Sequence, residues 1–120
     1  KLYFVAFKRS ILKNMITIYG IKNCDSCKKA LSHFGERANF HDVRNDRLSK
    51  ETLEKFIQYF GYKLINTRST TWKTLTPSEK SLEAFQLLDR FPTVMKRPVI
   101  ECSESQKRTI GWNNEILKQY

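Results

Sequence analysis

The stretch that decides the fold is MITIYGIKNCDSCKKALSHF, residues 15–34. Its first part, Met15–Tyr19, is an apolar and β-branched run, which predicts a buried strand. Its last part, Lys28–Phe34, has the composition of a helix. The pair Cys24 and Cys27 therefore stands where a strand passes into a helix, and this is the arrangement of a redox-active dithiol.

The two cysteines of this pair have different expected roles. Cys24 stands at the helix N-terminus, where unpaired N–H groups and the positive end of the helix dipole favour a thiolate. Cys27 follows on the same helical face, so its sulfur can reach Cys24 and close a disulfide. Because Asp25 adds a negative charge next to Cys24, we expect only a moderate lowering of the pKa of Cys24.

Zinc binding is a competing use of a C-x-x-C pair, and an inert buried pair is another. A structural zinc site needs about four ligands, whereas the chain has three cysteines in all, and His33 and His41 are not spaced as a ligand pair. We therefore predict no metal site. Cys102 lies in an apolar segment and is expected to be a small buried hydrophobic residue.

Composition limits the class of protein. A chain of 120 residues with 40% hydrophobic residues is long enough for one core without disulfides. An odd number of cysteines fits a reducing compartment, which predicts a cytoplasmic location. No apolar run approaches the roughly 20 residues of a membrane span.

The net charge of +10 could favour binding of nucleic acid, an acidic protein or an anionic small molecule. Because the basic residues are spread along the chain, we expect a solvated basic surface without direct nucleic-acid binding, and anionic thiols such as glutathione would be attracted to it.

The first 14 residues differ from the rest. They carry four basic residues and no acidic one, and their apolar part is too short for a signal-peptide core. We expect 1–14 to be an upstream extension or an artificially added segment that is poorly ordered; a mitochondrial-type targeting segment is the weaker alternative. The domain proper is then 15–120.

The rest of the chain predicts an α/β protein. Strands are expected at 15–19, about 38–43 and 108–110, and residues 95–102 are expected to be a loop that runs into a further strand. Helices are expected at about 25–34, 49–60, about 66–73, 76–91 and from 113 to about 117. The order is β-α-β, a block of helices, and β-β-α. It predicts a four-stranded mixed sheet with a helical subdomain inserted at about 49–91.

This order, with the dithiol after the first strand and Pro98 at the start of the third, resembles the thioredoxin-like fold. The segments IYGIKNC at 18–24, NTRS at 66–69 and KRP at 96–98 resemble more narrowly the arsenate-reductase-like family of the thioredoxin/glutaredoxin superfamily. That family includes ArsC reductases, Spx transcriptional regulators and YffB-like reductases. The run GIKNCD is most similar to the YffB-like branch, and the resemblance covers nearly all of 15–120.

The resemblance implies a site. It makes Cys24 the nucleophile and Cys27 its partner, and it places Arg68 and Arg97 near the nucleophile as anion-holding groups, which agrees with the effect of guanidinium groups on a nearby thiol. It implies that the bond before Pro98 is cis, although only about 5–6% of such bonds are. The remaining members of the expected substrate- or anion-binding set are Lys28 and Asn23.

The sequence also departs from the arsenate reductases. Gly20 stands where those enzymes carry a histidine, Lys28 where they have an arginine, and Gly111 about where they place a third arginine. The resemblance therefore implies first a monomeric cytoplasmic thiol–disulfide reductase with no bound cofactor, linked to glutathione as co-substrate or to glutaredoxin. The alternative is an Spx-like redox-sensing regulator that binds RNA polymerase, and a third possibility is an arsenate reductase.

Overall fold

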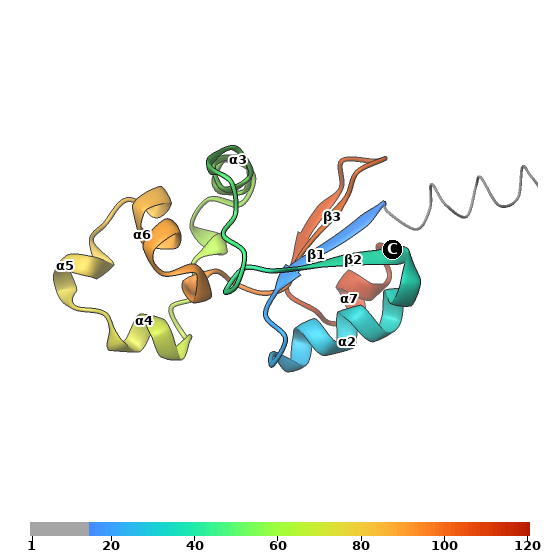
Figure 1. Cartoon of the computed structure of the whole chain (residues 1–120), viewed down its shortest axis with the longest axis horizontal. Helices are drawn as coiled ribbons and strands as arrows, with labels where there is room; N and C mark the ends of the chain where they lie inside the picture. Colours follow the sequence, from blue (N-terminus) through green and yellow to red (C-terminus); the bar gives the residue numbers. More distant parts are fainter. Residues whose placement is uncertain (1–14) are drawn as a thin grey trace, which may run out of the picture. The chain divides into compact units, whose positions relative to one another are not determined.

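The computed structural model describes residues 15–120 (Figure 1), so the extension expected at 1–14 lies outside the described residues. The described residues form two compact units, one made of 15–42 together with 97–120, the other of 43–96. The second unit contains the insertion expected at about 49–91 and extends beyond it at both ends. Within the described part, no helix is both long enough and apolar enough to cross a membrane.

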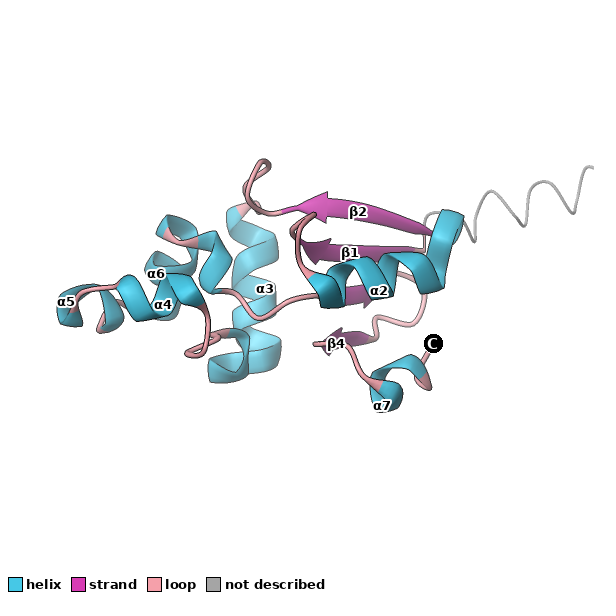
Figure 2. Ribbon diagram, turned by 90° about the horizontal axis from the view of Figure 1, so that it is seen from below, coloured by secondary structure: helices cyan, strands magenta, loops and turns pink. Residues whose placement is uncertain are grey.

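The first unit is built on a four-stranded mixed sheet (Figure 2). Its elements are β1 (Ile16–Gly20), α2 (Asp25–Phe34), η1 (Gly35–Arg37), β2 (Ala38–Asp42), β3 (Val99–Cys102), β4 (Arg108–Ile110) and α7 (Asn114–Leu117). The strand order is β2-β1-β3-β4; β1 runs parallel to β2, and β3 is antiparallel to both of its neighbours. The predicted β-α-β and β-β-α order is confirmed.

The core of this unit lies between the sheet and α2. Ile16, Ile18 and Ile100 project from one face of the sheet and pack with Ala30 and Phe34 of the helix. The partly buried residues that pack against this cluster include Trp112 before α7, Ile116 within it and Tyr120 after it. Because its apolar face is buried in this way, α2 has a fixed position, and the turn 21–24 joins its first residue to the end of β1.

The second unit is helical. Its elements are α3 (Lys50–Phe60), η2 (Gly61–Leu64), α4 (Thr70–Thr74), α5 (Pro77–Lys80), α6 (Ala84–Arg90) and η3 (Pro92–Val94). Its fully buried side chains include Phe56, Leu64 and Leu87. The predicted start signals are confirmed: the Ser49 hydroxyl accepts a hydrogen bond from the Thr52 N–H, and Thr76 and Glu79 form a capping box.

Two predicted helices differ from the structure. The helix expected at 76–91 is divided into α5 and α6, because Ser81 ends α5 with its hydroxyl donating to the Ser78 carbonyl, and Glu83 is the N-cap of a new helix. The helix expected at about 66–73 begins only at Thr70. The Asn66 side chain accepts from the Arg68 N–H and holds the preceding residues in a turn, and Ser69 provides the N-cap.

Candidate active site

The position of Cys24 follows from the passage from β1 to α2. Cys24 is the N-cap residue, with an extended backbone (φ −101°, ψ 124°), and its carbonyl accepts the first helical hydrogen bond, from the Lys28 N–H at 2.9 Å. The Cys24 N–H in turn donates to the Ile21 carbonyl at 3.3 Å, which closes the turn after β1. The half-buried Cys24 side chain therefore lies at the amino end of a ten-residue helix, where the helix dipole favours negative charge.

The pKa of Cys24 is lower than that of an ordinary cysteine. Partial burial of the sulfur would raise the pKa, but four contributions that lower it are larger in sum. They are hydrogen bonds from the Cys27 N–H and from the Cys27 thiol, followed by the positive charge of Arg97 and a hydrogen bond from the Arg97 side chain. All four stabilise the thiolate rather than the thiol, so this sulfur is the nucleophilic member of the pair.

Cys27 has the opposite electrostatic environment. Its side chain is 1% exposed. Burial is the largest cause that raises its pKa, and the hydrogen bond to Cys24 and the negative charge of Cys24 act in the same direction, while the Ile21 N–H and the Arg97 charge lower it; together these causes raise the pKa of Cys27 to about 12. At neutral pH Cys27 is therefore a thiol, and its S–H is a hydrogen-bond donor to the Cys24 sulfur.

Gly20, the last residue of β1, provides the space that Cys27 occupies. A Cβ atom at this position would overlap with the Cys27 Sγ and would lie 3.3 Å from the Cys27 Cβ and 3.7 Å from Phe40. Any other residue at position 20 would have to displace the second sulfur of the dithiol. The sequence identified Gly20 only as the residue that replaces a histidine, and the steric reason for the glycine becomes apparent in the structure.

Arg97 and Pro98 approach the dithiol from the start of β3. The peptide bond between them is cis, as predicted. Pro98 is fully buried, and its carbonyl accepts a hydrogen bond from the Gly111 N–H at 2.9 Å, which ties it to the residue after β4. Arg97 precedes this buried point, and its charge acts on both Cys24 and Cys27. The structure thus brings Arg97 to the sulfur that the sequence predicted it to serve.

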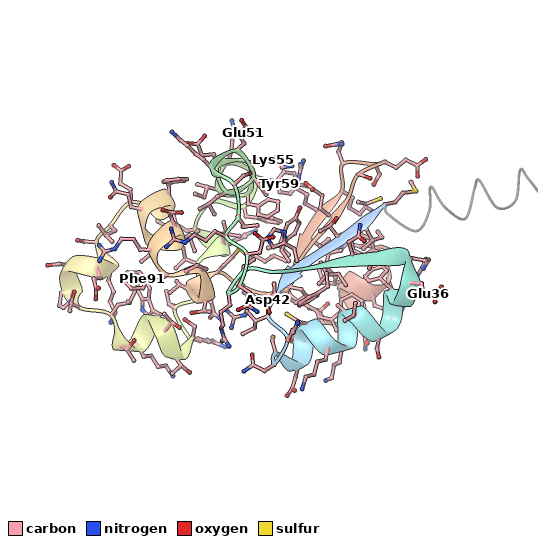
Figure 3. The ribbon with its side chains drawn as sticks, in the orientation of Figure 1. Glu36, Asp42, Glu51, Lys55, Tyr59 and Phe91 are labelled. Carbon is pink, nitrogen blue, oxygen red and sulfur yellow. The ribbon has the colours of Figure 1, made fainter. Side chains whose placement is uncertain are left out.

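The other predicted binding residues are placed differently. Asn23 in the turn before α2 and Lys28 in its first turns are exposed residues of the same segment as the dithiol. Arg68 belongs to the second unit, where it is exposed after the turn that Asn66 closes. Its role beside Cys24 stays a prediction. Asp42, the last residue of β2, stands in register with Gly20, whereas Glu36 lies in η1, before the other end of that strand (Figure 3).

The third cysteine is not the buried residue that its apolar segment suggested. Cys102 ends β3 and is half-buried, packed against the core cluster of the first unit without being enclosed by it. Its pKa is lowered despite partial burial, since the Ser105 side chain, the Ser105 N–H and the Glu104 N–H donate hydrogen bonds to it, while the Glu104 charge acts in the opposite direction. Over residues 15–120 no three His, Cys, Asp or Glu side chains are grouped so that they could hold a metal ion.

Comparison with known proteins decides the family. The model of the ArsC family matches residues 19–120 of this chain. The chain belongs to the ArsC family. An uncharacterized protein of Haemophilus influenzae is 41% identical over 109 residues, which are 84% of this chain and 94% of that protein.

Other relatives and solved structures carry functional names. The ArsC-family chain is 30% identical to the global transcriptional regulator Spx 2 of Lactococcus lactis over 115 residues, 88% of this chain and 86% of the regulator. A solved YffB protein has a TM-score of 0.76 at 28% identity, covering 87% of this chain and 96% of that one. An arsenate reductase related protein from Brucella melitensis has a TM-score of 0.66 at 32% identity, covering 89% and 94%.

These similarities agree with the geometry of the first unit. The fold is thioredoxin-like, and the recognised family is the one to which the three sequence segments pointed. A family that includes an arsenate reductase related protein and relatives of Spx supports a thiol-based redox function in the broad sense. The site at the start of α2 offers one activated sulfur, a second protonated sulfur and a guanidinium group for that function.

Proposed function

We propose that this ArsC-family protein is a cytoplasmic thiol–disulfide reductase that uses the Cys24 thiolate as nucleophile and glutathione, directly or through glutaredoxin, as the source of electrons. The observation that supports this most strongly is the division of roles within the pair: the pKa of Cys24 is lowered and that of Cys27 is raised to about 12. A dithiol in which one sulfur ionises far more readily than the other has a defined attacking atom.

In the proposed first step the Cys24 thiolate attacks one sulfur of a substrate disulfide. A bond forms between Cys24 and that sulfur, the substrate S–S bond breaks, and the second half leaves as a thiolate that takes a proton from water. The Arg97 charge is next to the nucleophile, where it can hold a carboxylate or another anionic group of the substrate. We expect Lys28, Asn23 and Arg68 to add to this attraction.

In the second step a thiolate attacks the Cys24 sulfur or the substrate sulfur bound to it. If glutathione attacks the bound substrate sulfur, Cys24 leaves as a thiolate; if Cys27 attacks Cys24, the substrate thiolate leaves and a Cys24–Cys27 disulfide remains for two further thiols to reduce. Formation of the mixed disulfide at Cys24 also removes the negative charge that helps to keep the pKa of Cys27 high. Cys27 therefore becomes easier to ionise only after a substrate is bound.

The test is reduction of hydroxyethyl disulfide by glutathione, coupled to glutathione reductase, with Cys24→Ser, Cys27→Ser and Cys102→Ser variants. We expect Cys24→Ser to lose about 10³-fold or more in rate, as removal of a nucleophile does, and Cys102→Ser to retain the wild-type rate. Retained activity in Cys27→Ser would assign the second step to glutathione, and lost activity would assign it to Cys27. Retained activity in Cys24→Ser would exclude the proposed nucleophile.

The second candidate is a redox-switched regulator, because Spx proteins are among the relatives. In this case oxidation of Cys24 and Cys27 would change binding to RNA polymerase with little turnover. A pull-down against polymerase, with the chain reduced and oxidised, tests this candidate.

The third candidate is an arsenate reductase. It is supported by the arsenate reductase related structure and by the charge of Arg97 beside Cys24, and a measurement of arsenate-dependent thiol consumption tests it.

A further inference from the structure

A hollow of about 490 Å³ opens beside the dithiol, entirely within the first unit. It lies along the flank of α2 that faces β2. The residues that line it are Ile21, Lys22, Cys27, Lys28, Leu31 and Phe40. Four of these six side chains are apolar or weakly polar, and Cys27, whose thiol hydrogen-bonds with Cys24, is one of them. The hollow therefore begins at the second sulfur of the reactive pair.

The helix periodicity explains why the hollow is apolar and yet unfilled. Cys27, Ala30 and Phe34 form the buried face of α2 and pack over the sheet. Leu31 is one position beyond that face, so its side chain reaches the flank, where it is 38% exposed although it is apolar. On the opposite wall Phe40 of β2 is only partly buried. An apolar group placed here would cover both side chains, which favours binding.

The charged part of the lining is positive only. Lys22 in the turn after β1 and Lys28 in α2 are both exposed at the rim, and no acidic residue is among the six lining side chains. The chain as a whole carries a net charge of +10, which adds a long-range attraction for anions. A ligand that fits this lining has an apolar body and an anionic group within reach of an ammonium.

We propose that the hollow is a substrate subsite, and that it binds the aromatic, carboxylate-bearing half of a small disulfide whose sulfur is attacked by Cys24. This proposal rests on the proposed function and specifies its substrate class. The ring lies against Leu31 and Phe40, and the carboxylate lies near Lys22 or Lys28. Glutathione, which is not aromatic, acts as the reductant and is not the ligand of this hollow.

The test measures the rate at which Cys24 of the reduced chain, freed of glutathione, attacks two disulfides, because free glutathione would itself reduce an aromatic disulfide. The two are dithiobis-nitrobenzoate, which is aromatic and carries carboxylates, and the neutral aliphatic hydroxyethyl disulfide. Leu31→Glu places a negative charge in the hollow at an exposed helix position, and Leu117→Glu is its matched control, because Leu117 is also 38% exposed and lies in α7. We expect Leu31→Glu to lower the rate constant for dithiobis-nitrobenzoate, relative to that for hydroxyethyl disulfide, about tenfold, equivalent to about 1.4 kcal/mol, and Leu117→Glu to leave this ratio unchanged. An unchanged ratio in Leu31→Glu, or an equal fall in both variants, overturns the subsite.

Binding of the fluorescent aromatic anion anilinonaphthalene sulfonate gives a second readout that needs no turnover. We expect the wild-type chain and Leu117→Glu to bind the dye, and Leu31→Glu and Lys22→Gln to bind it at least about fivefold more weakly, equivalent to about 1 kcal/mol. If the wild type reduces neither disulfide but binds the dye with this pattern, the proposed function fails and the anion-binding hollow stands. If the dye does not bind, or binds equally to all variants, the hollow is not the site.

Discussion

Two thiols in this chain have a lowered pKa, Cys24 at the start of α2 and Cys102 at the end of β3, and they differ in what stabilises them. Around Cys24 the stabilising groups are Cys27 and the charge of Arg97, whereas around Cys102 they are hydrogen bonds from Ser105 and Glu104, opposed by the charge of Glu104. Cys24 thus combines a lowered pKa with a second sulfur and a cation. The comparison indicates that a low pKa alone does not make a redox site, which also needs a resolving group and a place for the substrate.

The largest expected effect on folding comes from the packing under the dithiol. Gly20→Ala would place a methyl group where the Cys27 sulfur lies, and forcing a methyl group into a packed site costs roughly 1–3 kcal/mol in free energy of unfolding. We expect that loss in urea unfolding of the reduced protein. Gly20→Ala in a Cys27→Ala background should cost clearly less, because the clashing sulfur is gone.

Gly35→Ala is the matched control for this experiment. Gly35 follows α2 with φ of 56°, and a Cβ there would meet nothing within 4 Å. Its replacement should cost only the backbone strain of a residue with a Cβ held at positive φ, about 1–3 kcal/mol, with the same value in both backgrounds. Equal costs of Gly20→Ala with and without Cys27 would show that the sulfur does not occupy the space above Gly20.

The next effect is on the pH dependence of the free energy of unfolding, to which Cys27 and Cys102 contribute in opposite directions. The pKa of Cys27 is raised from an ordinary 9.0 to about 12 in the folded state, so between these values the unfolded chain has lost a proton that the folded chain retains. Stability from this group is complete below pH 9 and falls as the pH rises, by at most about 1.4 kcal/mol per pH unit. The pKa of Cys102 is lowered instead, so its contribution is present above pH 9 and is lost at lower pH, as the pH falls through the folded pKa.

Urea unfolding under reducing conditions at several values between pH 8 and 11 measures this slope. Relative to the wild type, Cys27→Ala should flatten the decline of the unfolding free energy with pH, and Cys102→Ala should not. The comparison uses slopes, so the constant cost of a cavity at position 27 does not enter it. An identical slope in wild type and Cys27→Ala would contradict the raised pKa.

Much of this site could be predicted from the sequence because its signals are local. An apolar run, a C-x-x-C pair and a helix pattern follow one another within 20 residues. They correctly predict β1, α2 and which of the two cysteines has the lowered pKa. The cis bond before Pro98 was predicted from the resemblance. By contrast, the close approach of Cys27 to Gly20 depends on how α2 packs over the end of β1, and the partial exposure of Cys102 depends on how the end of β3 packs against the core cluster. Both are tertiary contacts, which no local pattern predicts.

The same limit applies to the helical unit. Ser81 and Glu83 divide the helix expected at 76–91, although its apolar spacing is continuous, because one hydroxyl finds a carbonyl acceptor and a new N-cap begins two residues later. Arg68 was predicted through the NTRS segment alone. Its expected position near Cys24 depends on how residues 43–96 meet the rest of the chain, which is a long-range property that local sequence does not encode.

The smallest expected effects come from the two charges that distinguish Cys24 from Cys102. Arg97 lowers the pKa of Cys24 and Glu104 raises that of Cys102, so Arg97→Gln and Glu104→Gln should move the two values in opposite directions, up at Cys24 and down at Cys102. A unit charge a few ångströms away in a well-hydrated site contributes about 1 kcal/mol. We therefore expect alkylation by iodoacetamide near neutral pH to become about fivefold slower at Cys24 and up to about fivefold faster at Cys102.

Peptide mass spectrometry of chains labelled over a pH series measures the alkylation of both sulfurs in one sample. Each variant serves as the control for the other, because neither charge is a cause of the pKa shift of the other sulfur. A rise in the Cys24 rate on loss of Arg97 would mean that the guanidinium shields the sulfur more than it stabilises the thiolate, and the division of roles between the two sites would then rest on Cys27 alone.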